Sequence, residues 1–70
     1  MTDFTMHIQK VNLNRASFEE IAKLPEVGEI RAKEIIDHRP YHSWDDLRRK
    51  VPSFTSRDFN LLKSGYAEVN

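Results

Sequence analysis

The stretch from Leu24 to Ala32 constrains this chain most, because it places a proline and a glycine within a short run of apolar and charged residues. Pro25 disfavours helical geometry in the residue before it, so a preceding helix should end there. Gly28 can cap a new helix and adopts backbone angles that a side chain would forbid. The stretch therefore predicts a tight hairpin between two helices. The second helix would present unpaired N–H groups at the hairpin tip, where an anion such as phosphate could sit.

The segment before the hairpin has the signals of a short helix. Ser17 followed by Glu20 has the spacing of a capping box, which predicts a helix that begins at Phe18. Apolar residues recur at three-residue spacing and are expected to form its buried stripe, namely Phe18, Ile21 and Leu24. A helix this short must be held by packing.

The segment after the hairpin predicts a second helix, from Glu29 to about His38, which Arg39-Pro40 would stop. Ala32 lies four residues after Gly28, on the same helix face. A small side chain there would let the first helix approach closely, and a large one should force the hairpin open.

A weak internal repeat organises the rest of the chain. Ser43 to Leu47 echoes Ser17 to Ile21, and Val51 to Thr55 echoes Leu24 to Gly28. The repeat predicts a second pair of helices, which gives an all-α chain of four short helices in two hairpins.

The second copy of the repeat is degenerate. Thr55 stands in place of the glycine, but its hydroxyl can cap a helix over Ser56 to about Lys63, with Asp58 completing the capping-box spacing. Phe59 occupies the position of Ala32. The second hairpin should therefore be more open than the first.

The two ends of the chain have weaker signals. Residues 1–10 predict an extended arm lying on the helices, or alternatively a disordered tail, because their apolar residues alternate: Phe4, Met6 and Ile8. After Ser64-Gly65, Tyr66 is expected to fold back and residues 67–70 to form a loose tail. The domain itself would span residues 11–66.

The hairpin stretch resembles the helix-hairpin-helix family, whose motif reads roughly apolar-Pro-Gly-apolar-Gly, three residues, then Ala. The matching residues are Leu24, Pro25, Val27, Gly28 and Ala32. The lead-in from Val11 to Ser17, followed by Glu19-Glu20-Ile21, narrows the resemblance to the ComEA-type DNA receptor domain of bacterial competence proteins. One position departs from the pattern, since Glu26 stands where the family has its first hairpin glycine.

The resemblance implies two tandem helix-hairpin-helix units that grip the backbone of double-stranded DNA without reading its sequence, and it implies no cofactor. The implied contacts of the first hairpin are Glu26, Gly28, Ile30 and Arg31, with Lys33 as a further cation. The second hairpin and its basic surroundings would add Arg48, Thr55 and Arg57. Some relatives also hold a monovalent cation with hairpin carbonyls, which would be those of Leu24 and Val27.

Charge argues against this function. The chain has 11 Lys and Arg against 11 Asp and Glu, a formal net charge of zero, whereas cations supply most non-specific affinity for DNA. The second half is the basic half. Glu26 and Glu29 would stand beside a phosphate at the first hairpin, and each contact would cost on the order of a kcal/mol or more.

The alternative function is a structural or protein-interaction module that keeps the fold without binding DNA. The PsbU-type extrinsic protein of photosystem II, which resembles the same family, has such a role. Exposed Tyr41 and Trp44 would mark a protein contact, although Trp44 aligns with Phe18 and favours a place in the core.

Signals of catalysis or metal binding are weak, and we expect no enzyme. The acidic pairs Glu19-Glu20 and Asp45-Asp46 fall in the first turns of helices, where they complement the helix dipole. The three histidines, His7, His38 and His42, do not share a helix, and the chain has no Cys, so no metal site is expected.

No apolar run approaches the length of a membrane span, and the amino terminus lacks the layout of a signal peptide. ComEA-type receptors normally carry a membrane anchor ahead of this domain. The chain is expected in the cytoplasm if it is free-standing, and outside the cytoplasmic membrane if it is an excised receptor domain.

Overall fold

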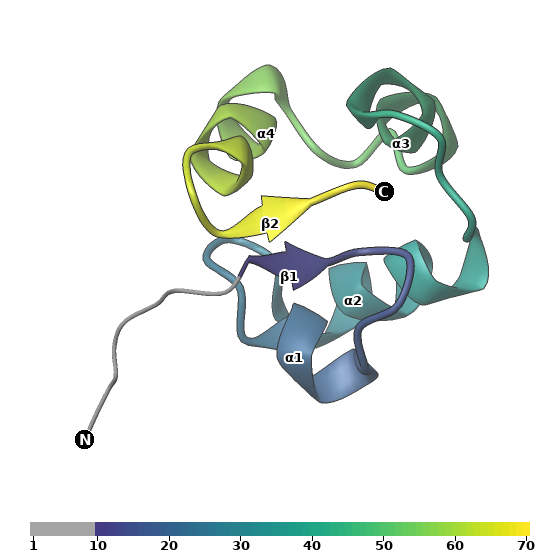
Figure 1. Cartoon of the computed structure of the whole chain (residues 1–70), viewed down its shortest axis with the longest axis vertical. Coiled ribbons are helices and arrows are strands. Elements are labelled where there is room, and N and C mark those ends of the chain that lie inside the picture. The colour runs from purple at the N-terminus through teal and green to yellow at the C-terminus, as the bar shows by residue number, and fades with distance from the viewer. Residues whose placement is uncertain (1–9) are drawn as a thin grey trace.

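The computed structural model describes residues 10–70. The elements follow in the order β1 (Val11–Asn12), α1 (Phe18–Ala22), α2 (Gly28–Asp37), α3 (Trp44–Lys50), α4 (Ser56–Lys63) and β2 (Ala67–Glu68). Helices α1 and α2 form the first hairpin, α3 and α4 form the second, and the short strand pair lies between them (Figure 1). The expectation of a helical fold with four short helices is confirmed. The expected arm with Phe4, Met6 and Ile8 lies outside the described residues.

Capping boxes fix the starts of two helices where the sequence placed them. At α1, the Glu20 N–H donates to Ser17 Oγ (3.2 Å), and the Ser17 N–H donates to Glu20 Oε1 (3.0 Å). At α4, the Asp58 N–H donates to Thr55 Oγ1 (3.2 Å), and the Thr55 N–H donates to Asp58 Oδ2 (3.0 Å). Each box satisfies backbone donors that a helix start leaves unpaired. The expected bounds of α4 are confirmed at both ends.

Helix α3 has a related start in which the acid reaches one residue further back. The Asp46 N–H donates to Ser43 Oγ (3.1 Å), but Asp46 Oδ2 accepts from the His42 N–H (3.0 Å). This backbone donor, with the neighbouring charges of Arg49 and Lys50, holds the pKa of the buried Asp46 carboxyl below its ordinary value against the effect of burial. The buried Asp46 carboxylate is therefore paired with one backbone N–H donor and with two cations, Arg49 and Lys50.

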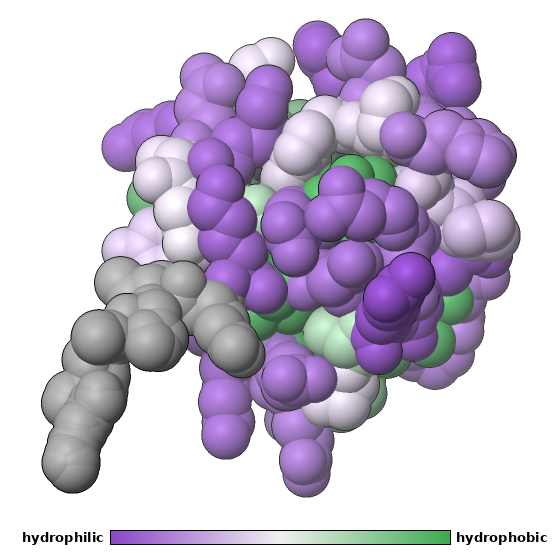
Figure 2. Space-filling model, in the orientation of Figure 1, coloured by the Kyte–Doolittle hydropathy of each residue, from purple (hydrophilic) through white to green (hydrophobic). Residues whose placement is uncertain are grey.

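The core joins both hairpins and the strands. Its buried apolar residues are Leu13, Ala16, Ile21, Leu24, Val27, Ala32, Ile35, Tyr41, Leu47, Val51, Phe54, Phe59, Leu62 and Ala67. Trp44 packs partly buried against this core, as expected, with its ring centroid 5.9 Å from that of Phe59. The face seen in Figure 2 is largely hydrophilic, with apolar groups showing only between polar ones.

Two core expectations were wrong. Phe18 is 40% exposed, and it borders a hollow that Gly28 and Glu29 at the start of α2 also line. Tyr41 is buried: its backbone N–H donates to Asn14 Oδ1 (2.7 Å) and its hydroxyl donates to the Ile35 carbonyl (2.6 Å). Burial raises the pKa of Tyr41 to about 12.

The last residues of the chain form a strand where a loose tail was expected. Strand β2 pairs in parallel with β1, in the register Val11 to Ala67 and Asn12 to Glu68. The Leu13 N–H donates to the Glu68 carbonyl (3.0 Å), and Ala67 is buried. A buried alanine and a short ladder with two backbone hydrogen bonds, from the Val11 N–H to the Tyr66 carbonyl and from the Leu13 N–H to the Glu68 carbonyl, therefore anchor the end of the chain. The expected domain bounds, residues 11–66, stay a prediction.

The two hairpins differ in how closely their helices approach. Helices α1 and α2 approach each other closely. Ala32 on α2 is fully buried. Helices α3 and α4 show no comparable close approach, and the rings of Trp44 on α3 and Phe59 on α4 meet edge to face. The expectation of a more open second hairpin is confirmed. None of the helices within residues 10–70 is long and apolar enough to cross a membrane.

Candidate nucleic-acid interface

The tip of the first hairpin is built from left-handed backbone. Glu26 has φ +67° and Gly28 has φ +72°. A side chain in this region costs roughly 1–2 kcal/mol, which explains why the family pattern has glycine at the position of Glu26. Helix α2 starts without a side-chain cap. The N–H groups of its first turn therefore have no side-chain acceptor and could bind an anion.

The tip of the second hairpin is built from side-chain caps. No residue from Val51 to Ser56 has a positive φ, and the Thr55–Asp58 box occupies two backbone donors at the start of α4. The predicted contact residue Thr55 is thus engaged in capping. What the second tip offers instead is the side chain of Arg57, which makes no ion pair within the part of the chain that the structure describes.

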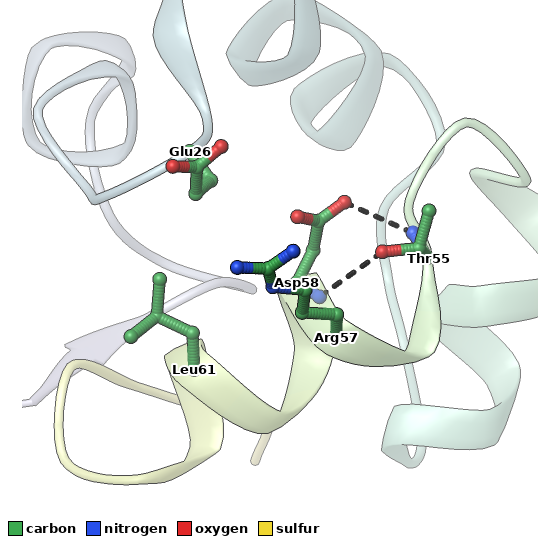
Figure 3. Close-up of a pocket in the computed structure, with 5 residues that line it drawn as sticks. All are labelled: Glu26, Thr55, Arg57, Asp58 and Leu61. Carbon is green, nitrogen blue, oxygen red and sulfur yellow. Dashed lines mark hydrogen bonds between the residues drawn. The ribbon is translucent and has the colours of Figure 1, made fainter.

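The two tips border one hollow of about 650 Å³ (Figure 3). It is lined by Glu26 from the first hairpin and by four residues of the second, namely Thr55, Arg57, Asp58 and Leu61. The Arg57 guanidinium points into the hollow, toward the side on which Glu26 lies. The structure thus gathers Glu26, Thr55 and Arg57, which lie in separate halves of the sequence, around one space.

Arg31 lies beside this space, but its guanidinium is engaged within the protein. Nη1 donates to the Glu26 carbonyl (2.9 Å) and to Asp58 Oδ2 (3.2 Å), and Nη2 donates to the Ser53 carbonyl (3.1 Å). The group also lies 4.7 Å from the ring centroid of Phe54. Arg31 was predicted as a cation for phosphate. Two of its three acceptors, Ser53 and Asp58, lie 22 and 27 residues away on the second hairpin, so no local pattern could have indicated them.

Asp58 joins the cap of α4 to this arginine. The Thr55 N–H lowers the pKa of the Asp58 carboxyl below its ordinary value, and the Arg31 charge lowers it further. The Asp58 carboxyl therefore keeps its charge to a lower pH than an ordinary aspartate does. Its negative charge is balanced by Arg31 and leaves Arg57 as the cation of the hollow.

The remaining predicted contact residues lie apart from the hollow. Ile30 is 82% exposed on α2, and Lys33 pairs with Asp37 (2.9 Å) on the same helix. Arg48 borders a smaller hollow between α3 and α4, together with Trp44, Phe59 and Lys63. The Leu24 carbonyl, one of the two expected cation ligands, accepts from the Val27 N–H (3.2 Å).

Several cations of the basic second half of the chain bind other groups of the protein. Arg39 donates to the Leu13 and Ala16 carbonyls (3.3 and 3.0 Å), while Arg49 and Lys50 both pair with Asp46. Among residues 10–70, no group of three His, Cys, Asp or Glu side chains is placed to hold a metal ion. The cations of the second hairpin that form no ion pair in this range are Arg48, Arg57 and Lys63.

Comparison with known proteins agrees with the hairpin geometry. The family described as "Helix-hairpin-helix motif" matches residues 6–64, which include both hairpins. The match supports nucleic-acid binding as the general function. No solved structure matches the chain significantly.

A protein named "Deoxyribonuclease" from Thioalkalivibrio sp. (strain K90mix) is 47% identical over 38 residues, which cover 54% of this chain and 10% of that protein. The chain thus spans about a tenth of that relative's length. This similarity contradicts the expectation that the chain is not an enzyme.

Proposed function

The chain belongs to the helix-hairpin-helix motif family, and on that premise we propose that it binds the backbone of double-stranded DNA without sequence preference, as ComEA-type receptor domains do. The observation that carries the proposal is the shared hollow, which both hairpin tips border. The first tip lines this hollow with Glu26, and the second lines it with Arg57. The start of α2 follows Glu26 by two residues and borders a separate hollow through Gly28 and Glu29. The proposed phosphate ligands are the backbone N–H groups at this helix start and the Arg57 guanidinium. Both are groups that bind phosphate oxygens.

The contributions of the predicted contact residues differ. Backbone N–H groups at Gly28 and Ile30 are the proposed donors of the first tip, and Arg57 and Arg48 are the proposed cations of the second hairpin. Glu26 opposes binding, because its carboxylate borders the space that a phosphate would enter. The expected result is weak, salt-sensitive binding.

Fluorescence anisotropy with a labelled duplex at several salt concentrations tests this function. The double variant Arg48→Ala with Arg57→Ala should weaken binding and make the slope of log affinity against log salt shallower by about 1.8, since each lost phosphate contact accounts for about 0.9. The matched control, Arg15→Ala with Arg49→Ala, removes the same charge from residues that border neither hollow. It should leave that slope unchanged.

Equal losses in both double variants would show that net charge alone governs binding. If the natural sequence shows no salt-sensitive binding, the alternative module, which keeps the fold and contacts a protein, replaces the proposal.

The role of Glu26 can be separated into charge and backbone. Glu26→Gln removes the carboxylate but keeps a side chain at a left-handed position, whereas Glu26→Gly also relieves the backbone. Both should raise affinity for duplex DNA if repulsion is the obstacle. An increase with Gly alone would assign the effect to the shape of the tip.

The similarity to a deoxyribonuclease favours a second candidate function, DNA cleavage. Incubation of supercoiled plasmid with the chain and Mg²⁺ tests it. Nicked circles that increase with protein concentration and disappear with a chelator would support cleavage. Binding without nicking would limit the chain's part to holding DNA.

A further inference from the structure

We propose that Arg31 is a positioning residue that fixes the spacing of the two hairpin tips, and that it is not itself a ligand of phosphate. This inference deepens the proposed DNA binding and rests on it. Its basis is the set of contacts that one side chain makes with both hairpins.

The guanidinium of Arg31 contacts three separate segments. It donates to the Glu26 carbonyl in the turn of the first hairpin, to the Ser53 carbonyl in the turn of the second, and to Asp58 Oδ2 in the first turn of α4, at 2.9, 3.1 and 3.2 Å. A planar guanidinium presents donors in a fixed fork, so its acceptors are held in a fixed arrangement. The Arg31 side chain is only 30% exposed, which leaves little of it for a ligand.

A second contact from α2 holds the same segment of the second hairpin. The Ser53 hydroxyl donates to Glu34 Oε1 (3.1 Å), and Glu34 lies one turn beyond Arg31 on α2. Ser53 is thus held through both its carbonyl and its side chain. We name Arg31, Glu34, Ser53 and Asp58 the tip clamp.

The tip clamp also sets the start of α4. Asp58 Oδ2 accepts from Arg31 and from the Thr55 N–H, so the oxygen that caps α4 is the one that ties α4 to the first hairpin. Arg57 precedes Asp58 on this first turn. The clamp therefore determines where the Arg57 guanidinium stands relative to the start of α2.

Fixed spacing has a consequence for affinity. When two contact points belong to one rigid body, binding at one brings the other to its phosphate at high effective concentration, and this advantage is lost when the points move independently. Loss of the clamp should therefore weaken DNA binding by more than loss of one positive charge does.

The variants Arg31→Lys and Arg31→Ala distinguish positioning from phosphate contact, with Lys33→Ala as a control for charge on the same helix. Lysine keeps the charge but cannot hold three acceptors in one plane. Both Arg31 variants should lose affinity for duplex DNA about equally, by about tenfold or more, and Lys33→Ala should lose less. If Arg31→Lys binds like the natural sequence and Arg31→Ala changes only the salt slope by about one contact, Arg31 is a phosphate ligand and the inference is wrong.

A distance measurement tests the clamp without DNA. The chain has no cysteine, so spin labels on Glu29→Cys and Ser56→Cys report the separation of the two exposed helix starts. The distance distribution should be narrow in the otherwise natural chain and broader with Arg31→Lys. A width that does not change would overturn the clamp.

A milder variant guards against unfolding. Glu34→Ala removes only the contact with the Ser53 hydroxyl and should broaden the same distribution to a smaller extent. Absence of DNA binding by the natural sequence would remove the proposed function, whereas the distance measurement decides the clamp independently of that result.

Discussion

The two hairpins make similar turns by different chemistry. In the first, the backbone itself bends through left-handed residues, Glu26 and Gly28, and α2 begins without a side-chain cap. In the second, the backbone stays in the ordinary regions and Thr55 with Asp58 caps α4. A proline, Pro25 or Pro52, lies within each turn. The comparison shows that a repeat can keep the place of a turn while one set of interactions replaces another.

The two tips also differ in the groups that they offer to an anion. The first tip has backbone donors without side-chain acceptors, but it carries Glu26 and Glu29. In the second tip, backbone N–H groups donate to the side chains that cap α4. This tip carries Arg57, which forms no ion pair within the described part of the chain. Each hairpin lacks what the other has, so the proposed binding needs both.

The largest effect on stability should follow from removing the Phe59 ring of the open second hairpin. Phe59 is buried and packs against both Trp44 and Phe54, with ring centroids 5.9 and 5.4 Å away. Phe59→Ala should lower the free energy of unfolding by about 3–5 kcal/mol, measured by urea denaturation. A loss under about 1 kcal/mol would mean that α3 and α4 close over the space, and that their open arrangement does not depend on this ring.

Filling the tight hairpin is the converse change. Ala32 is fully buried on α2, and Ala32→Phe should overpack the crossing with α1 and lower the free energy of unfolding by about 1–3 kcal/mol. Thermal unfolding followed by circular dichroism measures the change. Unchanged stability would count against the close crossing as described.

The two turns should respond to glycine with opposite signs. Glu26→Gly relieves a left-handed side chain and should raise the free energy of unfolding by up to about 1 kcal/mol. Ser53→Gly, at the equivalent position of the second hairpin, should lower it, because the backbone there needs no glycine and the hydroxyl contact with Glu34 is lost. A gain from both substitutions would indicate that the two turns do not differ in backbone strain.

The smallest effect is expected at acid pH, and it belongs to the second hairpin. The pKa of Asp58 is lower in the folded chain than its ordinary value. Its contribution to stability is therefore complete above the unfolded-state pKa, about 3.9, and is lost as pH falls through the lower folded-state pKa. Stability measured between pH 5 and 2 should fall less steeply for Asp58→Asn than for the natural sequence. Identical slopes would show that the carboxylate adds nothing to the junction.

Local sequence signals predicted the local parts of this fold. Ser17 with Glu20 and Thr55 with Asp58 fixed two helix starts, because a capping box lies within four consecutive residues. Pro25 and Gly28 located the first turn for the same reason. The family resemblance also indicated the strained position at Glu26, where glycine is the usual residue.

Contacts between distant segments escaped prediction. Arg31 looked like a free cation because two of its three acceptors, Asp58 and Ser53, lie on the other hairpin. The strands β1 and β2 have two residues each, which is too short for an alternating pattern to show. Tyr41 was expected to be exposed, because nothing near it in the sequence indicates the Asn14 amide that draws its backbone inward. The sequence indicated three residues that line the candidate hollow, Glu26, Thr55 and Arg57. It did not indicate the Arg31 contacts that join the two sides of the hollow.

The strand pair has a consequence for the order of folding. It joins the two ends of the described chain, where Asn14 donates to the carbonyl of Asn70, 56 residues away. Each hairpin can form from neighbouring segments, whereas this ladder must close the longest loop in the molecule, and contacts of such separation slow folding. We expect the two hairpins to form first and the strands β1 and β2 to pair last. Kinetic φ-values near zero at Ala67, beside higher ones at Ile21, would be the signature of that order.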